Sequence, residues 1–289
     1  MMKFFDLHCD TITECYVKNK KLKTNDLDIS LEKAECIDKW NQVFAIWMPD
    51  ELRGKEAEDY YCKVLEKFKE ECKDVKGAIL AVEGGSALAG KLENVEKLYR
   101  DGVKIITLTW NKENELASGC FSDEDKGLTS FGKEAVKEMA KSGIVPDVSH
   151  LGEKGFYDLC EATDFPFIAS HSDVYALENH PRNLKDEQIK IIIERKGLIG
   201  LNFYNKFLGE GNSVQKLLDH AKHILLLGGT DVLALGSDFD GCTINEEIKG
   251  IEKMPALYNA FYSYFGRTLA DKIFFENADN YFKRQVFTK

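Results

Sequence analysis

Five residues with metal-binding side chains occur in short polar motifs along the chain: His8, Asp10, Glu83, His150 and His171. One residue separates His8 from Asp10, so in an extended strand their side chains point to the same side, about 6.5–7 Å apart along the chain. A metal ion could bridge them. His150 and His171 could converge on a second ion, and Glu83 could bridge both ions because a carboxylate has two oxygens. These nitrogen and oxygen ligands favour a two-metal site for zinc or another borderline transition metal.

Each of these residues lies at or just beyond the end of a short apolar segment that is predicted to be a β-strand. Such segments alternate with longer helical patterns, which is typical of βα units in a parallel sheet. The predicted strands are Lys3–Leu7, Val43–Met48, Ala78–Val82, Val103–Thr109, Ile144–Val148, Phe167–Ala169, Leu198–Leu201 and Val232–Leu235. The predicted helices are Leu31–Trp40, Lys55–Cys72, Leu92–Arg100, Phe131–Ser142, Lys154–Ala162, Lys185–Lys196 and Val214–Leu227, with two more near the C-terminus.

Eight parallel strands joined by helices in 289 residues favour a (β/α)8 TIM-type barrel, with residues 1–289 as a single domain. An open doubly wound sheet is the alternative, but it is expected to carry a glycine-rich nucleotide turn after an early strand, and none is present. Catalytic groups of barrels lie at the carboxyl ends of strands, where all five metal-binding residues are predicted. Other polar residues share these positions and are expected to hydrogen-bond to metal-bound imidazoles. They are Asp147, Ser149, Ser170, Ser172 and Asp173.

The composition excludes several classes of protein. The 49 acidic residues exceed the 39 basic ones, giving a formal charge of −10, which disfavours nucleic acid as a partner. No apolar run approaches the roughly 20 residues that span a bilayer, so no membrane association is predicted. The first residues contain no apolar core of a signal peptide, and a cytoplasmic location is expected by default. The eight cysteines form no Cys-x-x-Cys pair and are predicted to be reduced thiols.

Eight motifs in fixed order carry a resemblance to a known family. They are Asp6-Leu7-His8-Cys9-Asp10, Ala81-Val82-Glu83-Gly84-Gly85, Gly127-Leu128-Thr129-Ser130-Phe131-Gly132, Asp147-Val148-Ser149-His150, Ile168-Ala169-Ser170-His171-Ser172, His180-Pro181-Arg182-Asn183-Leu184, Asn202-Phe203-Tyr204 and Gly236-Ser237-Asp238-Phe239-Asp240-Gly241. Together they make the chain resemble the membrane (renal) dipeptidase family of binuclear zinc peptidases, within the amidohydrolase superfamily.

The resemblance implies a role for each matching residue. His8, Asp10 and Glu83 would hold one zinc ion, and Glu83, His150 and His171 would hold the other. Asp238 would be the acid/base for the water shared by the ions, Arg182 would pair with the substrate's terminal carboxylate, and Tyr204 would contact the substrate. The expected function is that of a zinc-dependent dipeptidase that hydrolyses dipeptides with a metal-bridging hydroxide. The resemblance also suggests a homodimer.

One motif departs from the family pattern. Where the family has a histidine after Leu-Thr, thought to bind the substrate carbonyl, this chain reads Thr107-Leu108-Thr109-Trp110-Asn111. Trp110 offers only an indole N–H donor, so it either limits dipeptide cleavage or shapes a pocket for a different substrate. Two alternatives therefore stand beside the dipeptidase: a binuclear hydrolase of another small amide, ester or lactone, and a metal-binding family member with little turnover.

Overall fold

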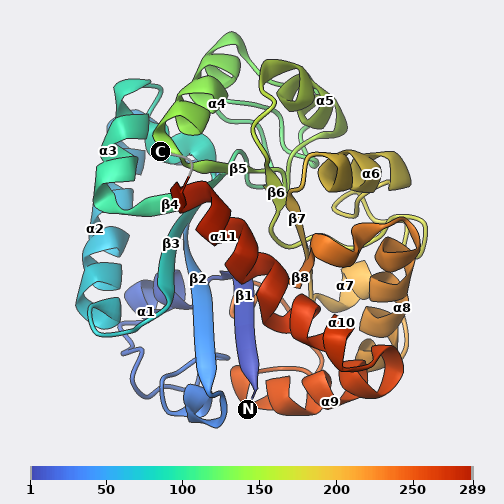
Figure 1. The fold of residues 1–289 in the computed structure, drawn as a ribbon. Helices are drawn as coiled ribbons and strands as arrows, with labels where there is room; N and C mark the ends of the chain where they lie inside the picture. The colour runs from blue at the N-terminus through green and yellow to red at the C-terminus, as the bar shows by residue number, and fades with distance from the viewer. Residues whose placement is uncertain (1, 288–289) are drawn as a thin grey trace.

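The computed structural model describes residues 2–287 and contains a closed barrel of eight parallel strands (Figure 1). The strands are β1 Lys3–Cys9, β2 Lys39–Trp47, β3 Ala78–Glu83, β4 Val103–Thr107, β5 Val145–Asp147, β6 Ile168–Ala169, β7 Leu198–Leu201 and β8 Leu233–Leu235. They pair in sequence order, and β8 closes on β1 where Leu235 lies beside Asp6. Every segment predicted as a strand forms one, which confirms the (β/α)8 barrel.

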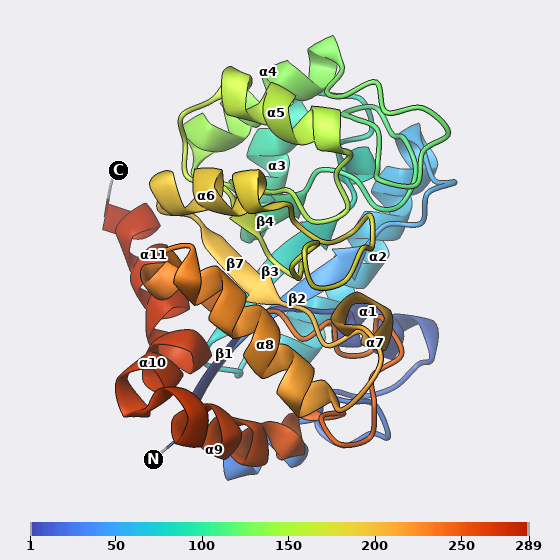
Figure 2. The ribbon, with the colours of Figure 1, turned by 90° about the vertical axis from the view of Figure 1, so that its right-hand side faces the viewer.

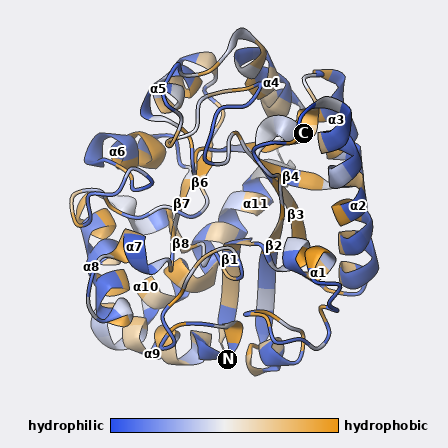
Figure 3. Cartoon of the chain, turned by 180° about the vertical axis from the view of Figure 1, so that it is seen from behind, coloured by the Kyte–Doolittle hydropathy of each residue, from blue (hydrophilic) through white to orange (hydrophobic). Residues whose placement is uncertain are grey.

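Helices surround the barrel and cover the outer faces of the strands (Figures 1 and 2). Their bounds are α1 Thr11–Val17, α2 Gly54–Cys72, α3 Glu93–Asp101, α4 Ser130–Ser142, α5 Glu153–Ala162, α6 Asp186–Glu194, α7 Asn205–Leu208, α8 Ser213–Leu226, α9 Met254–Phe265, α10 Arg267–Asp271 and α11 Asn277–Phe287. Seen from behind in Figure 3, hydrophilic colour dominates the outward surfaces of these helices, as expected for amphipathic elements that pack on a sheet.

The prediction of a helix at Leu31–Trp40 is wrong. Only a short 3₁₀ turn forms there, at Lys33–Cys36, and β2 already begins at Lys39. Trp40 pairs with Phe4 of β1 in the parallel ladder. The apolar residues in this segment have a spacing that also suits a helix, but pairing with β1 decides the conformation, because short apolar patterns do not distinguish the two structures.

The inside of the barrel is a second apolar core, separate from the core between the strands and the helices. Phe5 and Leu7 of β1 pack there with residues from the other strands and with Phe275 and Tyr281. The hydroxyl of Tyr281 in α11 donates a hydrogen bond to the carbonyl of Pro166, just before β6. Helix α11 therefore closes the amino end of the barrel, as Figures 1 and 2 show, and leaves the carboxyl end open for a site.

Among the described residues, no helix combines the length and the apolar character needed to cross a membrane.

Candidate functional site

The carboxyl ends of four strands and the turns after them bring the predicted metal-binding residues together. His8 lies in β1 and Glu83 ends β3, while Asp10, His150 and His171 follow β1, β5 and β6 by one to three residues. All five are buried. His150 has a φ of +67°, in the left-handed region that non-glycine residues rarely adopt, so the chain turns sharply where its imidazole enters the cluster.

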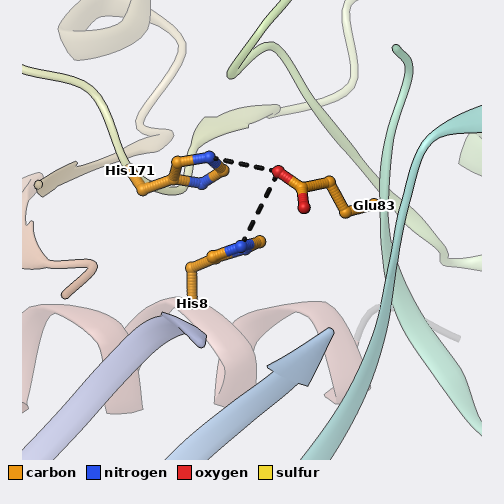
Figure 4. A group of neighbouring side chains, drawn as sticks. All are labelled: His8, Glu83 and His171. Atoms are coloured by element: carbon orange, nitrogen blue, oxygen red, sulfur yellow. Dashed lines mark ion pairs between the residues drawn. The ribbon is translucent and has the colours of Figure 1, made fainter. Parts of the chain in front are cut away.

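A single oxygen of Glu83 is the centre of the cluster. Its Oε1 lies 2.9 Å from Nε2 of His150, 3.4 Å from Nε2 of His171 and 3.7 Å from Nε2 of His8. Figure 4 shows the imidazoles of His8 and His171 converging on this oxygen. Nε2 of His150 and Nε2 of His171 are themselves only 3.0 Å apart. Three imidazole nitrogens thus face one carboxylate in a buried space.

A second group shares His8 with the first. Nε2 of His8 lies 3.6 Å from Oδ2 of Asp10 and 3.9 Å from Oδ1 of Asp238. The ligand atoms of His8, Glu83 and His171 lie within 4.8 Å of one another, and so do those of His8, Asp10 and Asp238. Either set could hold a metal ion. The second set contains Asp238, which the family resemblance assigns to proton transfer.

Two observations show that this space fits a metal ion. Nε2 of His8 and Oδ1 of Asp10 are buried without a hydrogen-bond partner, and a buried polar atom is costly unless a ligand satisfies it. Gly241 also lies against the same carboxylates: a Cβ there would come within 2.1 Å of Oδ2 of Asp10 and 2.5 Å of Oδ1 of Asp238. Only glycine leaves this space free.

The electrostatics of the two neighbouring imidazoles also suit metal binding. Burial, with the positive charge of Arg182, lowers the pKa of His150 well below its ordinary value. Burial also lowers the pKa of His171 well below its ordinary value, and the positive charges of His8 and Arg182 add to the effect. A lowered pKa favours the neutral form of each imidazole, which is the form that binds a metal through a ring nitrogen.

Ser170 and Asp147 form a hydrogen-bonded chain to Nδ1 of His171, the ring nitrogen that faces away from Glu83. Nδ1 of His171 lies 2.7 Å from Oγ of Ser170, and that hydroxyl donates a 2.6 Å hydrogen bond to Oδ2 of Asp147. Oγ of Ser149 accepts a hydrogen bond from the backbone N–H of His171. These contacts are those expected around a metal-bound imidazole, whose outer nitrogen usually donates to such a partner.

The partner of His150 is a residue that the sequence analysis did not select. Nδ1 of His150 lies 3.1 Å from Oδ1 of Asn111, in the segment after β4. The available signal was the position of Asn111 near the end of a barrel strand, where polar residues gather. In the sequence, Asn111 stands out only as the neighbour of Trp110.

Asp238 is held by an amide. Nδ2 of Asn202, just after β7, donates a 3.0 Å hydrogen bond to Oδ2 of Asp238. The other oxygen, Oδ1, faces Nε2 of His8 at 3.9 Å. Asp238 has a φ of +61°, so a strained turn after β8 places this carboxylate beside the imidazole cluster.

Two cavities meet at His150. The first, of about 330 Å³, is lined by Trp47, Glu83, Trp110, Asp238 and Gly241 among others. The second, of about 340 Å³, is lined by Ser172 and Arg182 among others, and His150 lines both. The predicted site residue Trp110 thus lies at the first cavity and Arg182 at the second. Trp47, which was not among the predicted site residues, also lines the first cavity.

Arg182 is 4% exposed and is held by several weak contacts. Its Nη1 lies 3.4 Å from Oγ of Ser172, its Nη2 lies 3.3 Å from the carbonyl of His171, and its guanidinium lies over the ring of Phe207. Its Nε has no partner. A buried cation with a free donor beside a cavity suits an anionic ligand group.

Tyr204 lies differently from the other predicted site residues. Its ring packs against Phe207 at 4.8 Å between centroids, and it lines neither of the two cavities. His180, another histidine beyond a strand, also packs on Phe207 and stays outside the imidazole cluster. The structure therefore brings the other predicted site residues together at the mouth of the barrel, while Tyr204 packs on Phe207 and lines neither cavity.

A closed (β/α)8 barrel with buried imidazoles and carboxylates at the carboxyl ends of its strands has the architecture of a metal-dependent barrel hydrolase. Residues 61–278 match the model of the membrane dipeptidase family, peptidase family M19. The chain belongs to this family and is a metallo-dipeptidase.

Comparisons with individual proteins agree with this assignment. An uncharacterized protein of Klebsiella pneumoniae, encoded in the pqqA 5′ region, is 32% identical over 223 residues, which span 72% of this chain and 82% of the relative. A solved dipeptidase of family M19 has a TM-score of 0.92 and 25% identity, with 98% of each chain covered. A metallopeptidase of Rhodobacter sphaeroides, solved with a phosphinate mimic of L-Ala-D-Ala, has a TM-score of 0.91 and 23% identity, with 98% of this chain and 99% of that chain covered.

Proposed function

We propose that this metallo-dipeptidase binds two zinc ions and cleaves dipeptides across the boundary between the two cavities. His8, Asp10 and Glu83 would hold one ion, and Glu83, His150 and His171 would hold the other. The observation that carries the proposal is the convergence of three imidazole nitrogens within 3.7 Å of Oε1 of Glu83. Glu83 is the carboxylate that these imidazoles share, and each of its two oxygens can bind one ion, so it would bridge the pair.

The ions, when bound, would polarise the scissile carbonyl and lower the pKa of the attacking water. The chain's own residues supply the rest. Oδ1 of Asp238 faces the cluster while Asn202 holds its other oxygen, so this carboxylate is oriented to accept a proton from the water and return it to the leaving amine. The amide of Asn202 is neutral and does not titrate, so it orients the carboxylate without competing for the proton that Asp238 accepts.

Arg182 would bind the substrate's C-terminal carboxylate in the second cavity. Its guanidinium keeps a free Nε donor and makes only long hydrogen bonds to Ser172 and His171, so stronger charge-assisted bonds remain available to a ligand. With the carboxylate there, the peptide bond lies toward His150 and the substrate's N-terminal residue enters the first cavity. We infer the limit to dipeptides from this arrangement, in which each cavity would accept one residue of the substrate.

The proposal is tested by incubating zinc-loaded protein with a dipeptide library that includes C-terminal D-residues, beside tripeptides, simple esters and lactones. We expect hydrolysis of dipeptides alone among the peptides, and loss of the activity after chelation with recovery on adding zinc. Hydrolysis of lactones or esters with no cleavage of any dipeptide would contradict the proposed substrate class.

A further inference from the structure

The first cavity has an aromatic wall formed by Trp47 and Trp110. Trp47 ends β2 and pairs in the ladder with Glu83 of β3, while Trp110 follows β4 by three residues. Their rings meet edge to face, with centroids 4.9 Å apart and an interplanar angle of 81°. Both side chains are only partly buried, so apolar ring surface remains available beside the reactive cluster.

Outside the imidazole cluster, the acidic residues that line this cavity, Glu14 and Asp240, already have partners. Glu14 forms an ion pair with Lys18 one turn further along α1. Oδ1 of Asp240 accepts from the backbone N–H of Asp28, and its Oδ2 accepts from the hydroxyl of Thr11. Away from the imidazole cluster, the free surface offered to a substrate side chain is therefore aromatic rather than anionic.

We propose that the Trp47–Trp110 pair selects dipeptides with an aromatic N-terminal residue. This inference rests on the proposed function, which places the N-terminal half of the substrate in the first cavity. Aromatic rings prefer edge-to-face or offset contacts and gain about 0.5–1.5 kcal/mol beyond the area they bury, which corresponds to about 2- to 10-fold in affinity. A cavity of about 330 Å³ has room for one such ring.

The test compares kcat/KM for Phe-Ala, Lys-Ala, Leu-Ala and Gly-Ala in the zinc-loaded wild type, Trp47→Leu and Trp110→Leu. We expect Phe-Ala to be the best substrate and its advantage over Gly-Ala to fall about 3- to 10-fold in each variant. Trp40→Leu is the matched control, because Trp40 lies in the same strand as Trp47 but donates its indole N–H to Gln42, outside both cavities. Across a series of Ala-Xaa dipeptides, the order of preference for Xaa should be the same in the wild type and in both variants, because Xaa would lie in the second cavity.

Calorimetry measures the binding of Phe-Ala and Gly-Ala to the Asp238→Asn variant without turnover. It therefore tests the aromatic selection separately from the proposed dipeptidase function. Turnover of all four dipeptides without preference for Phe, or a preference for Lys, overturns the aromatic selection and leaves the proposed function standing. An equal loss of selectivity in Trp40→Leu also overturns it. Absence of both turnover and binding contradicts the proposed function itself.

A separate observation concerns Asn111, whose Oδ1 lies 3.1 Å from Nδ1 of His150. We infer that Asn111 is a positioning residue for metal binding. By accepting the Nδ1–H, the amide oxygen selects the tautomer in which Nε2 carries a lone pair and faces Oε1 of Glu83. His171 has a serine–aspartate pair for the same purpose, so the two imidazoles are oriented by different chemistry.

Zinc affinity, measured by chelator competition on the purified protein, tests this role without reference to activity. Loss of such a partner typically costs about 10- to 100-fold in metal affinity, which we expect for Asn111→Leu. Asn111→Asp keeps the acceptor and should retain or raise the affinity, and Lys112→Ala controls for changes in the same loop. Wild-type affinity in Asn111→Leu, or an equal loss in Asn111→Asp, would overturn the inference.

Discussion

Asn202 donates a 3.0 Å hydrogen bond to one oxygen of Asp238 and leaves the other oxygen facing His8. The carboxylate is therefore fixed in orientation by a neutral group that does not titrate. A proton acceptor that must return its proton within one turnover benefits from such a partner, because the hydrogen bond persists in both protonation states.

The Asp238→Asn variant should keep its metal and lose most of its turnover. An amide preserves the size of the side chain but cannot accept and return a proton, and such transfer is typically worth about 10²–10⁴ in rate. Steady-state kinetics with elemental analysis checks this. Glu14→Gln removes a charge from the same cavity and should retain most of the activity. Full activity of Asp238→Asn across the pH range would refute the mechanism.

The Glu83→Gln variant should bind both zinc ions more weakly. If Glu83 bridges the ions, its neutral analogue weakens two sites at once, whereas a ligand of one ion would affect one. Zinc titration with metal analysis should give close to two ions per chain in the wild type. Glu71→Gln, which alters a partly buried carboxylate that pairs with Lys67 of the same helix, is the matched control. A wild-type stoichiometry near one that does not rise with added zinc would rule out the bridge.

Arg182 should make a free C-terminal carboxylate a requirement of the substrate. Hydrogen bonds to charged groups contribute about 1.5–3 kcal/mol, so we expect the kcat/KM of a dipeptide to exceed that of its C-terminal amide by about 10- to 100-fold. In Arg182→Gln this difference should largely disappear. Equal kcat/KM values for the two wild-type substrates would leave Arg182 without this role.

Trp110→His should raise the cleavage of dipeptides with small N-terminal residues. The family resemblance places an imidazole at this position near the reacting carbonyl, and loss of one such donor typically costs about 10²–10³ in kcat. Kinetics on Ala-Ala at equal metal content checks the expectation. Unchanged or lower hydrolysis, with both ions present, would show that Trp110 is not the limiting departure from the family pattern.

His220 should make the protein less stable as the pH falls. It is fully buried in α8, its Nδ1 accepts from the N–H of Val174, and burial lowers its pKa from 6.5 to about 4. Below pH 6.5, His220 is protonated in the unfolded chain but stays neutral in the folded chain. The free energy of unfolding therefore decreases as the pH falls from 6.5 to about 4. A shift of this size corresponds to about 3 kcal/mol.

Urea denaturation at pH 7.5 and pH 5, compared between the wild type and His220→Gln, measures this contribution. The glutamine does not titrate, so the variant should lose less stability than the wild type over this interval, whatever its stability at pH 7.5. Parallel pH dependences in the two proteins would contradict the assigned pKa.

Local sequence was sufficient to predict the strands and to place the predicted metal-binding residues at their carboxyl ends. Eight apolar segments predict strands, polar motifs end several of them, and a parallel barrel brings the carboxyl ends of all its strands to one mouth. For this reason His8, Glu83 and His171 meet in the structure although they are far apart in the chain. The segment Leu31–Trp40 failed because its apolar spacing suits either a helix or a strand, and only pairing with β1 decides between them.

Tertiary structure alone decided the surroundings of these residues. The sequence marks Trp110 as a departure from the family pattern but does not pair it with Trp47, and the two rings form one wall because β2 and β4 both flank β3, which carries Glu83. The contacts of Asn111 with His150 and of Asn202 with Asp238 likewise join different strand ends. Residue type and strand position are local properties that a sequence displays. Distances between side chains depend on barrel closure and on the turns after each strand, which no local pattern encodes.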